Sequence, residues 1–329
     1  MELKLNHKDE KKVDEIIELI KKNKKFIITT HQNPDGDAIS SELAIYTLLK
    51  RMGKEAEIIN ESEVPKIYKF LPDVKKVKVY KSNRKKFDVG IILDCGSIER
   101  IGKVRKCFEK TSKIINIDHH LTNAKFGDVN WVNSSFSSCG EMVYFIFEKL
   151  SRITKKEATY LYTAILTDTC GFIHHLTPYT MEIAKRLIEK GAEPEKIARK
   201  VYLEKPLKSV RLFILSLNSL KFDRKNKVCW SKVTEEMYRK TGTDEEDTEG
   251  FVDFLTTIKE AEVVFLIKEK NNGIKVSFRS KGKFDVEELA RKFGGGGHKE
   301  ASGCFFENES IEEVEKKVIQ EISKRWKGY

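Results

Sequence analysis

The sequence predicts an α/β protein with an N-terminal, mostly parallel sheet that has helices on both faces, a helical connector, and a smaller C-terminal α+β domain. Three observations predict this. Short apolar runs of strand length alternate with helical patterns over residues 1–190, as in βαβ units. Residues 194–222 carry only helical spacing. Strand patterns then return, and two of them, 263–267 and 274–278, lie close together in the sequence. We therefore expect domains at 1–193 and 223–329, joined by 194–222.

Hydrophobic spacing defines the elements of the N-terminal domain. Apolar residues at helical intervals predict helices at 13–22, 38–52, 141–150, 156–166 and 180–189. Gly53 and Gly191 mark the ends of two of them. Short apolar runs predict buried strands at 26–30, 56–59, 89–93 and 114–117. The residues of 38–52 expected to face the core are Leu43, Ile45, Leu48 and Leu49.

The C-terminal domain is predicted in the same way. Strand patterns occupy 228–233, 263–267 and 274–278, and helical patterns occupy 249–259, 286–292 and 311–324. The second and third strands are joined by Asn271-Asn272-Gly273, which is favourable for a hairpin turn.

Composition limits the class of protein. A chain of 329 residues that is 40% hydrophobic and 34% charged fits about two globular domains rather than disorder. No stretch approaches the about 18 apolar residues of a membrane span. The N-terminus also lacks the apolar run of a secretory signal, so we expect a cytoplasmic protein without a membrane partner.

The net charge of +11 suits an anionic partner such as a nucleotide, although a lysine-rich surface explains it equally well. The six cysteines are scattered and form no CxxC pair, so neither a disulfide framework nor a zinc ribbon is expected.

A histidine and two carboxylates follow the first predicted strand. His31, Asp35 and Asp37 stand in HQNPDGDA. Pro-Asp-Gly-Asp is also ordinary turn chemistry, and Asp37 could cap the next helix.

Similar residues recur after later runs. Asp94 follows the run 89–93. The triplet Asp118, His119 and His120 follows the run 114–117, and Asp168 follows the stretch 164–167. Helix capping explains any one of them, but strand ends of an open sheet converge on one crevice. Carboxylates gathered there repel one another unless cations lie between them. Mixed imidazole and carboxylate ligands suit Mn(II), with Fe, Co or Zn as alternatives. Their number fits two ions about 3.5–4 Å apart.

These residues resemble the motifs of the DHH phosphoesterase superfamily. His31, Asp35 and Asp37 match its first motif, Asp94 its second, Asp118-His119-His120 its signature triplet, and Asp168 its fourth. Residues 293–303, FGGGGHKEASG, resemble the signature of the DHH-associated domain of oligoribonuclease/pAp-phosphatase and cyclic-di-AMP phosphodiesterase members. The resemblance makes 1–193 the catalytic domain and 223–329 the nucleotide-binding domain.

The resemblance also implies roles. One ion would be held by His31, Asp35 and Asp94, and a second by Asp37, Asp94, His119 and Asp168, with Asp94 bridging. Asp118 would orient His119, and His120 would face the substrate phosphate. The ions would be Mn²⁺, or alternatively Mg²⁺ or Co²⁺, and would activate a hydroxide.

Residues of the C-terminal domain would bind the nucleotide. Glycines let backbone N–H groups approach a phosphate closely, although a glycine run alone can be merely a flexible loop. The expected substrate-binding residues are Arg279, Ser280, Gly295, Gly296, Gly297, His298 and, from the first domain, Arg100.

Some positions depart from the family pattern. Ser40 and Cys170 replace glycines, and an arginine usual in the fourth motif is missing. His174 and His175 lie nearby, either as substitutes for that arginine or as surface residues. Cys95 and Cys170 are expected to be small buried thiols rather than nucleophiles.

The leading hypothesis is a Mn-dependent phosphodiesterase that converts cyclic di-AMP, linear pApA, short oligoribonucleotides and pAp to mononucleotides. One alternative is an inorganic pyrophosphatase or exopolyphosphatase, whose C-terminal domain lacks the GGGGH signature. A RecJ-like exonuclease would be longer, and a non-catalytic nucleotide sensor would usually have lost a metal ligand. The sequence ranks none of the substrates and leaves a homodimer open.

Overall fold

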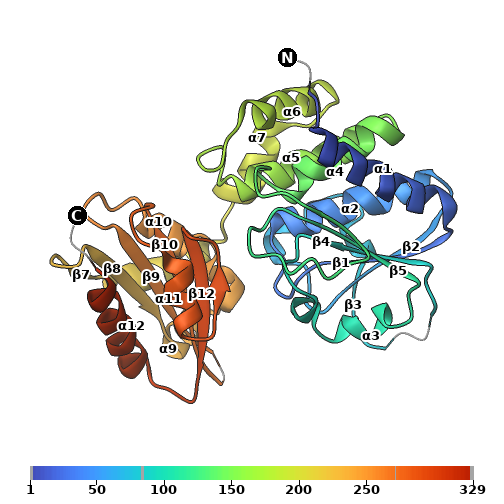
Figure 1. Cartoon of the computed structure of the whole chain (residues 1–329). Helices are drawn as coiled ribbons and strands as arrows, with labels where there is room; N and C mark the ends of the chain where they lie inside the picture. The colour runs from blue at the N-terminus through green and yellow to red at the C-terminus, as the bar shows by residue number, and fades with distance from the viewer. Residues whose placement is uncertain (1–2, 83–84, 271, 327–329) are drawn as a thin grey trace. The chain divides into compact units, whose positions relative to one another are not determined.

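The computed structural model describes residues 3–82, 85–270 and 272–326, and the chain divides into two compact units, 1–204 and 205–329 (Figure 1). The division falls within the predicted connector. Helix α7 (Pro194–Ala198) and a π-helical turn, η4 (Arg199–Leu203), belong to the first unit, and α8 (Leu207–Asn218) belongs to the second. The connector ends in a strand, β7 (Lys221–Asp223), that the sequence did not predict because it holds a single apolar residue.

The first unit is built on a sheet of six parallel strands in the order β3-β2-β1-β4-β5-β6. The strands are β1 (Lys25–Thr29), β2 (Glu55–Asn60), β3 (Val77–Val79), β4 (Val89–Leu93), β5 (Lys113–Asp118) and β6 (Val129–Val132). The short edge strands β3 and β6 were not predicted, because neither contains an apolar run. Strand order reverses between β1 and β4, and ligands of open parallel sheets bind at such a reversal.

Helices cover both faces of this sheet, as predicted (Figure 1). One face packs against α1 (His7–Lys22), α2 (Gly36–Arg51), α4 (Cys139–Leu150) and α5 (Lys155–Asp168), with α6 (Pro178–Glu189) packed on α5. The other face is covered by η3 (Ile98–Val104) and α3 (Arg105–Phe108). Phe26 and Ile28 of β1 join the first core, and Ile27 joins the second, because successive strand residues point to opposite faces. The four residues predicted to face the core from α2 are all buried. Two 3₁₀ turns, η1 (Lys66–Tyr68) and η2 (Val74–Lys76), precede β3.

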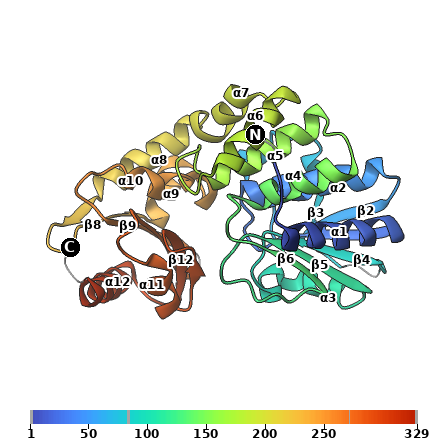
Figure 2. The ribbon, with the colours of Figure 1, turned by 45° about the horizontal axis from the view of Figure 1, so that its top comes forward.

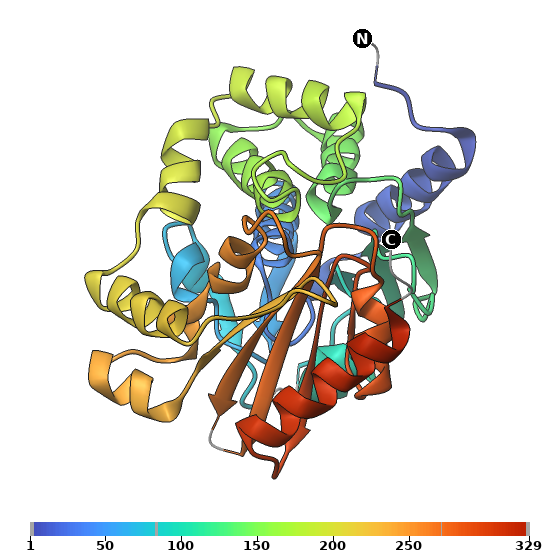
Figure 3. The ribbon, with the colours of Figure 1, turned by 90° about the vertical axis from the view of Figure 1, so that its left-hand side faces the viewer.

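The second unit holds a mixed six-stranded sheet in the order β11-β12-β10-β9-β8-β7, in which only β8 and β9 are parallel. Its remaining strands are β8 (Val228–Val233), β9 (Val263–Lys270), β10 (Gly273–Ser280), β11 (Gly296–Gly297) and β12 (Ala301–Glu307). Figure 2 shows α8, α9 (Glu235–Thr241) and α10 (Phe251–Leu255) on one side, and α11 (Val286–Lys292) and α12 (Ile311–Arg325) on the other. Figure 3 shows α12 lying across the strands.

Three predictions for this unit need correction or remain untested. The helix predicted at 249–259 is only α10, preceded by the 3₁₀ turn η5 (Glu245–Thr248), because Gly250 takes φ +81° between them. The strand β12 was missed because Ser302 and Gly303 interrupt its apolar pattern. Asn271 of the predicted hairpin turn lies outside the described residues. Among the described residues, no helix is long and apolar enough to cross a membrane.

Candidate functional site

The loops after β1 and β4 bring together the first group of predicted ligands. His31 follows β1, and Asp94 follows β4, its neighbour in the sheet. Asp35 is the N-cap of α2, and its Oδ1 accepts a hydrogen bond of 3.0 Å from the N–H of Ala38. Potential ligand atoms of His31, Asp35 and Asp94 lie within 4.8 Å of one another. Asp35 therefore caps the helix, as the turn interpretation expects, and also lies within reach of the other two residues.

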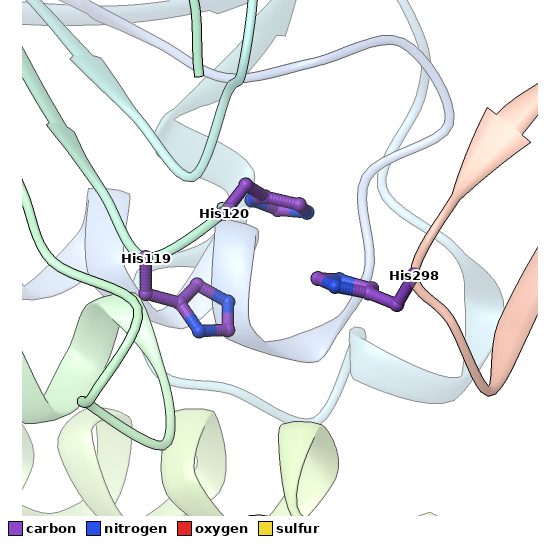
Figure 4. Close-up of side chains that lie close together, drawn as sticks. All are labelled: His119, His120 and His298. Atoms are coloured by element: carbon purple, nitrogen blue, oxygen red, sulfur yellow. The ribbon is translucent and has the colours of Figure 1, made fainter. Parts of the chain in front are cut away.

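His119 and His120 lie on the loop after β5, with their rings close together (Figure 4). A second group of predicted ligands lies around His119. The Nε2 atom of His119 is 3.2 Å from Oδ2 of Asp168, 3.5 Å from Oδ1 of Asp94 and 4.0 Å from Oδ2 of Asp37. These four residues are the ones expected to hold the second ion. Asp94 is thus next to both groups.

Asp168 reaches this group from an unexpected element. The sequence grouped it with residues at strand ends, but it is the last residue of helix α5, predicted at 156–166, which packs against α2. The prediction that all the acidic residues follow strands is therefore wrong for this residue. Burial and the carboxylates of Asp94 and Asp35 raise the pKa of Asp168 to about 7, although the nearby His119 opposes this.

Asp94 is the centre of the cluster. It is 2% exposed and takes φ +51°, a left-handed conformation that is uncommon for residues other than glycine. Its Oδ2 lies 3.6 Å from Nε2 of His31. Within the described residues its Oδ1 has no hydrogen-bond partner. A buried carboxylate oxygen without a donor is rare in folded proteins, and a cation coordinated there would satisfy it. The mixed imidazole and carboxylate donors around it fit a divalent metal ion.

The charges of the cluster are strongly coupled. Burial, together with the carboxylates of Asp94 and Asp168, raises the pKa of Asp37 well above its ordinary value. Burial alone would raise the pKa of Asp94 too, but His119 and His31 hold it well below the ordinary value. Burial would lower the pKa of His119, yet the carboxylates of Asp168 and Asp94 hold that pKa well above its ordinary value. Without bound cations, the cluster can lower its charge repulsion only by keeping protons.

Asp37 is held by groups that sequence reasoning missed. Its Oδ2 accepts a hydrogen bond of 2.6 Å from the N–H of Cys139, and its Oδ1 accepts bonds from the N–H of Gly140 and from Ser41 Oγ. The two N–H groups belong to the first turn of α4, where the helix dipole favours a carboxylate. Ser138, which caps α4 three residues before Glu141, is the sequence signal for this helix start.

The signature triplet is arranged differently from the expectation. Oδ1 of Asp118 lies 2.6 Å from Nδ1 of His120, whereas Nδ1 of His119 lies 3.4 Å from the carbonyl oxygen of Phe136. The expectation that Asp118 orients His119 is therefore wrong, and it orients His120. Oδ2 of Asp118 accepts a bond of 2.5 Å from Asn123, a second residue that the sequence analysis missed.

Other predicted residues flank the cluster. Arg100 is exposed, and its carbonyl oxygen accepts a hydrogen bond from the N–H of Gln32, next to His31. Cys95 is buried as expected, and burial raises the pKa of its thiol to about 12, which argues against a nucleophile. Cys170 is exposed, contrary to expectation, because it lies in the loop after α5 with φ +50°. His174 and His175 are also exposed.

The predicted substrate-binding residues of the second unit gather near one end of its sheet. Arg279 pairs with Ala301, which exchanges backbone hydrogen bonds with His298, and Gly296 pairs with Gly303. Nε of Arg279 donates a bond of 2.7 Å to Asp253. Ser280 is the next strand residue, so it points to the opposite face, where it is 8% exposed and its Oγ accepts a bond from the N–H of Gly282.

Sterics explain part of the glycine run. A Cβ on Gly295 would lie 2.1 Å from the carbonyl oxygen of Gly303, and Gly297 takes φ +147°. Gly296 has no such restriction, since a Cβ there would meet nothing within 4 Å. Fold requirements therefore account for Gly295 and Gly297 but not for Gly296.

Known families match both units. The DHH family, N-terminal domain, matches residues 25–165, and the DHHA1 domain matches residues 225–324. The chain is 30% identical over 300 residues to the bifunctional oligoribonuclease and PAP phosphatase NrnA of Thermus thermophilus, covering 90% of this chain and 88% of the relative. It is 29% identical to the Bacillus subtilis protein of the same name, covering 88% of this chain and 92% of the relative. The crystal structure of an exopolyphosphatase-related protein from Bacteroides fragilis superimposes with a TM-score of 0.90 at 29% identity, covering 96% of both chains.

Proposed function

Because this chain belongs to the DHH family, we propose that it is a metal-dependent phosphodiesterase that hydrolyses small nucleotides to mononucleotides. The proposed substrates are cyclic di-AMP, linear pApA, short oligoribonucleotides and pAp. Two relatives named as oligoribonuclease and PAP phosphatase, matched over most of their length, support this class of substrate. We assign hydrolysis to the first unit and nucleotide binding to the second.

The observation that carries the proposal is the buried, unsatisfied Oδ1 of Asp94 among imidazoles and carboxylates. His31, Asp35 and Asp94 would hold one divalent ion, and Asp37, Asp94, His119 and Asp168 a second, with Asp94 shared. The donor set suits Mn²⁺, with Mg²⁺ or Co²⁺ as alternatives. Bound there, the ions would supply activated water and neutralise charge on the phosphoryl oxygens.

His120 is proposed to act on the substrate directly. Burial by itself would lower the pKa of His120, but the carboxylates of Asp118 and Asp94 outweigh it and hold the pKa above the ordinary value. The imidazole can therefore stay cationic and donate a hydrogen bond to a phosphoryl oxygen on which charge develops. Asp118 is a positioning residue, because it holds Nδ1 and leaves Nε2 as the donor.

In the second unit, a phosphate of the nucleotide is proposed to bind to the guanidinium of Arg279, the N–H groups of Gly296 and Gly297, and the imidazole of His298. Ser280 would act through the turn that follows it, since its Oγ already accepts the N–H of Gly282. Gly295 would act by letting the loop pack against β12. Arg100 would act near His31, because the backbone carbonyl of Arg100 accepts a hydrogen bond from the N–H of Gln32 in the same loop.

The proposal is tested by turnover with Mn(II) on cyclic di-AMP, pApA, pAp, a five-nucleotide RNA and pyrophosphate in parallel. We expect release of mononucleotides from the nucleotide substrates, and loss of that release with a chelator. Absence of turnover on all four nucleotides, with metal bound, would contradict the proposal.

The second candidate function is hydrolysis of pyrophosphate or polyphosphate. It is favoured by the high similarity to a solved structure described as exopolyphosphatase-related. Cleavage of pyrophosphate or polyphosphate with all nucleotides inert would select it.

A further inference from the structure

One face of the β10–β12 pair is left partly open. Along β10, Ile274, Val276 and Phe278 are buried in the core beneath α11 and α12, whereas the residues between them are only half-buried. β12 alternates in the same way, and Phe305 on its open side is 40% exposed. An exposed phenylalanine is informative here because both neighbours of Phe305 in the chain, Cys304 and Phe306, are buried.

The open face connects Phe305 to the proposed phosphate-binding residues. The register pairs Arg279 with Ala301, Ser277 with Gly303, and Lys275 with Phe305, and cross-strand partners point to the same face. Gly303 is in turn the partner of Gly296 in β11. Two residues along a strand span about 6.8 Å, so Phe305 lies two such steps from Ala301 on one continuous surface.

The residues along this path have small side chains. Ser277, Ala301 and Gly303 are small, and they separate the guanidinium end of the face from the aromatic end. The Phe305 ring lies against Gly273 of β10, because a Cβ there would be 3.0 Å from its Cζ. The ring thus contacts the backbone of β10 and is 40% exposed.

The aromatic end is bordered by cations. Lys268, Lys270 and Lys275 surround Glu245, with Nζ–Oε distances of 3.7, 2.6 and 3.1 Å. Burial would raise the pKa of Glu245, but the lysines hold it at about 2, so the carboxylate is ionised. Glu307, two residues after Phe305 along β12, is exposed and adds a second negative charge to this end of the face. Lys275, 33% exposed, is the cross-strand partner of Phe305, so a cation lies beside the ring.

We propose that Phe305 is a stacking platform for a base of a single-stranded oligoribonucleotide whose phosphate is bound at Arg279 and Gly296. This inference rests on the proposed function and makes it more specific. Aromatic rings beside cations bind bases by stacking with little sequence preference. Ligands of two or more nucleotides would use both ends of the face, whereas pAp, which has a single base, would depend less on Phe305.

Binding to the full chain with chelator present, so that no turnover occurs, tests the platform. The ligands are a five-nucleotide RNA and a matched five-residue ribose-phosphate chain without bases. Stacking of one base contributes about 1–3 kcal/mol, so Phe305→Ala should weaken RNA binding about 5- to 150-fold. The same substitution should leave binding of the abasic chain unchanged. Phe305→Trp should bind RNA like the wild type, and Phe305→Leu should behave like the alanine variant.

Phe222→Ala is the matched control. Phe222 is 38% exposed on β7, at the opposite edge of the same sheet, and its substitution should not change RNA binding. Equal loss of RNA and abasic binding in Phe305→Ala, or a lower melting temperature with RNA affinity intact, would show that Phe305 only covers Gly273 and would overturn the inference. Wild-type protein that binds RNA but hydrolyses no nucleotide with Mn(II) would instead overturn the proposed function and leave the platform standing.

Discussion

Asp118 Oδ1 and His120 Nδ1 are 2.6 Å apart, so the first and third residues of the Asp-His-His triplet form a pair, and the middle one turns away. β5 ends at Asp118, and the two histidines follow it on the loop, where their rings meet edge to face with centroids 5.0 Å apart. His119 instead faces Asp37, Asp94 and Asp168. This division of roles leads to the first prediction.

Asp118→Asn should lower kcat about 10- to 100-fold, because His120 loses the carboxylate that orients it and keeps it cationic. Metal content, measured by atomic absorption, should stay at the wild-type level, since Asp118 acts on His120. The pKa of His120 should fall, so the alkaline limb of the pH–rate profile should move to lower pH. Loss of metal with an unmoved profile would place Asp118 among the ligands instead.

Asp94→Asn should have a larger effect. The amide removes the negative charge that both ligand groups share, so we expect metal content to fall. Turnover should drop by more than about 100-fold, which is the loss typical of removing a residue that only orients a metal ligand. Stability without metal should fall, because His119 and His31 hold the pKa of Asp94 well below its ordinary value, so the ionised carboxylate stabilises the folded state and the amide does not. A variant that retains full metal content and activity would contradict the assignment of Asp94 as the shared ligand.

Gly296→Ala and Gly295→Ala form a matched pair. A Cβ on Gly295 would be 2.1 Å from a backbone oxygen, so that variant should lose about 1–3 kcal/mol of unfolding free energy. Gly296 has open space, so its variant should melt like the wild type but bind nucleotide more weakly, because the new methyl group obstructs a phosphate. Unchanged nucleotide affinity in Gly296→Ala would remove this glycine from the binding site.

Glu42 makes stability depend on pH. It is fully buried in α2, where Oε2 accepts a bond of 2.8 Å from Asn60 while Oε1 has no partner among the described residues. Burial raises its pKa to about 8, although the bond from Asn60 opposes this. The folded state therefore binds a proton that the unfolded state releases at lower pH, so the free energy of unfolding decreases as pH rises from about 5 to 8.

Glu42→Gln should remove this dependence, because glutamine keeps the acceptor for Asn60 and cannot ionise. We expect similar stability of variant and wild type at pH 5, and an advantage of a few kcal/mol for the variant at pH 9, from urea unfolding of chelator-treated protein. Parallel stability curves across this range would show that Glu42 does not titrate on folding.

The clustering of the candidate ligand residues could be predicted because most of them follow apolar runs that must be strands. Once 26–30, 89–93 and 114–117 are parallel strands, their carboxyl ends meet, and His31, Asp94 and His119 come together without any detailed packing. The glycine run was visible in the sequence, but which of its glycines the fold requires was not.

What the sequence determined by itself was local: strands and helices set by the spacing of apolar residues, and the chemistry at their ends. The tertiary structure alone decided three things, since each depends on contacts between segments far apart in the chain. Packing of α5 on α2 brings Asp168 to the cluster from a helix, the first turn of α4 supplies N–H donors to Asp37, and the register of β10 with β12 places Phe305 opposite Lys275. Local periodicity carries no information on such pairings, because they are chosen by the burial of whole faces rather than by neighbours in sequence.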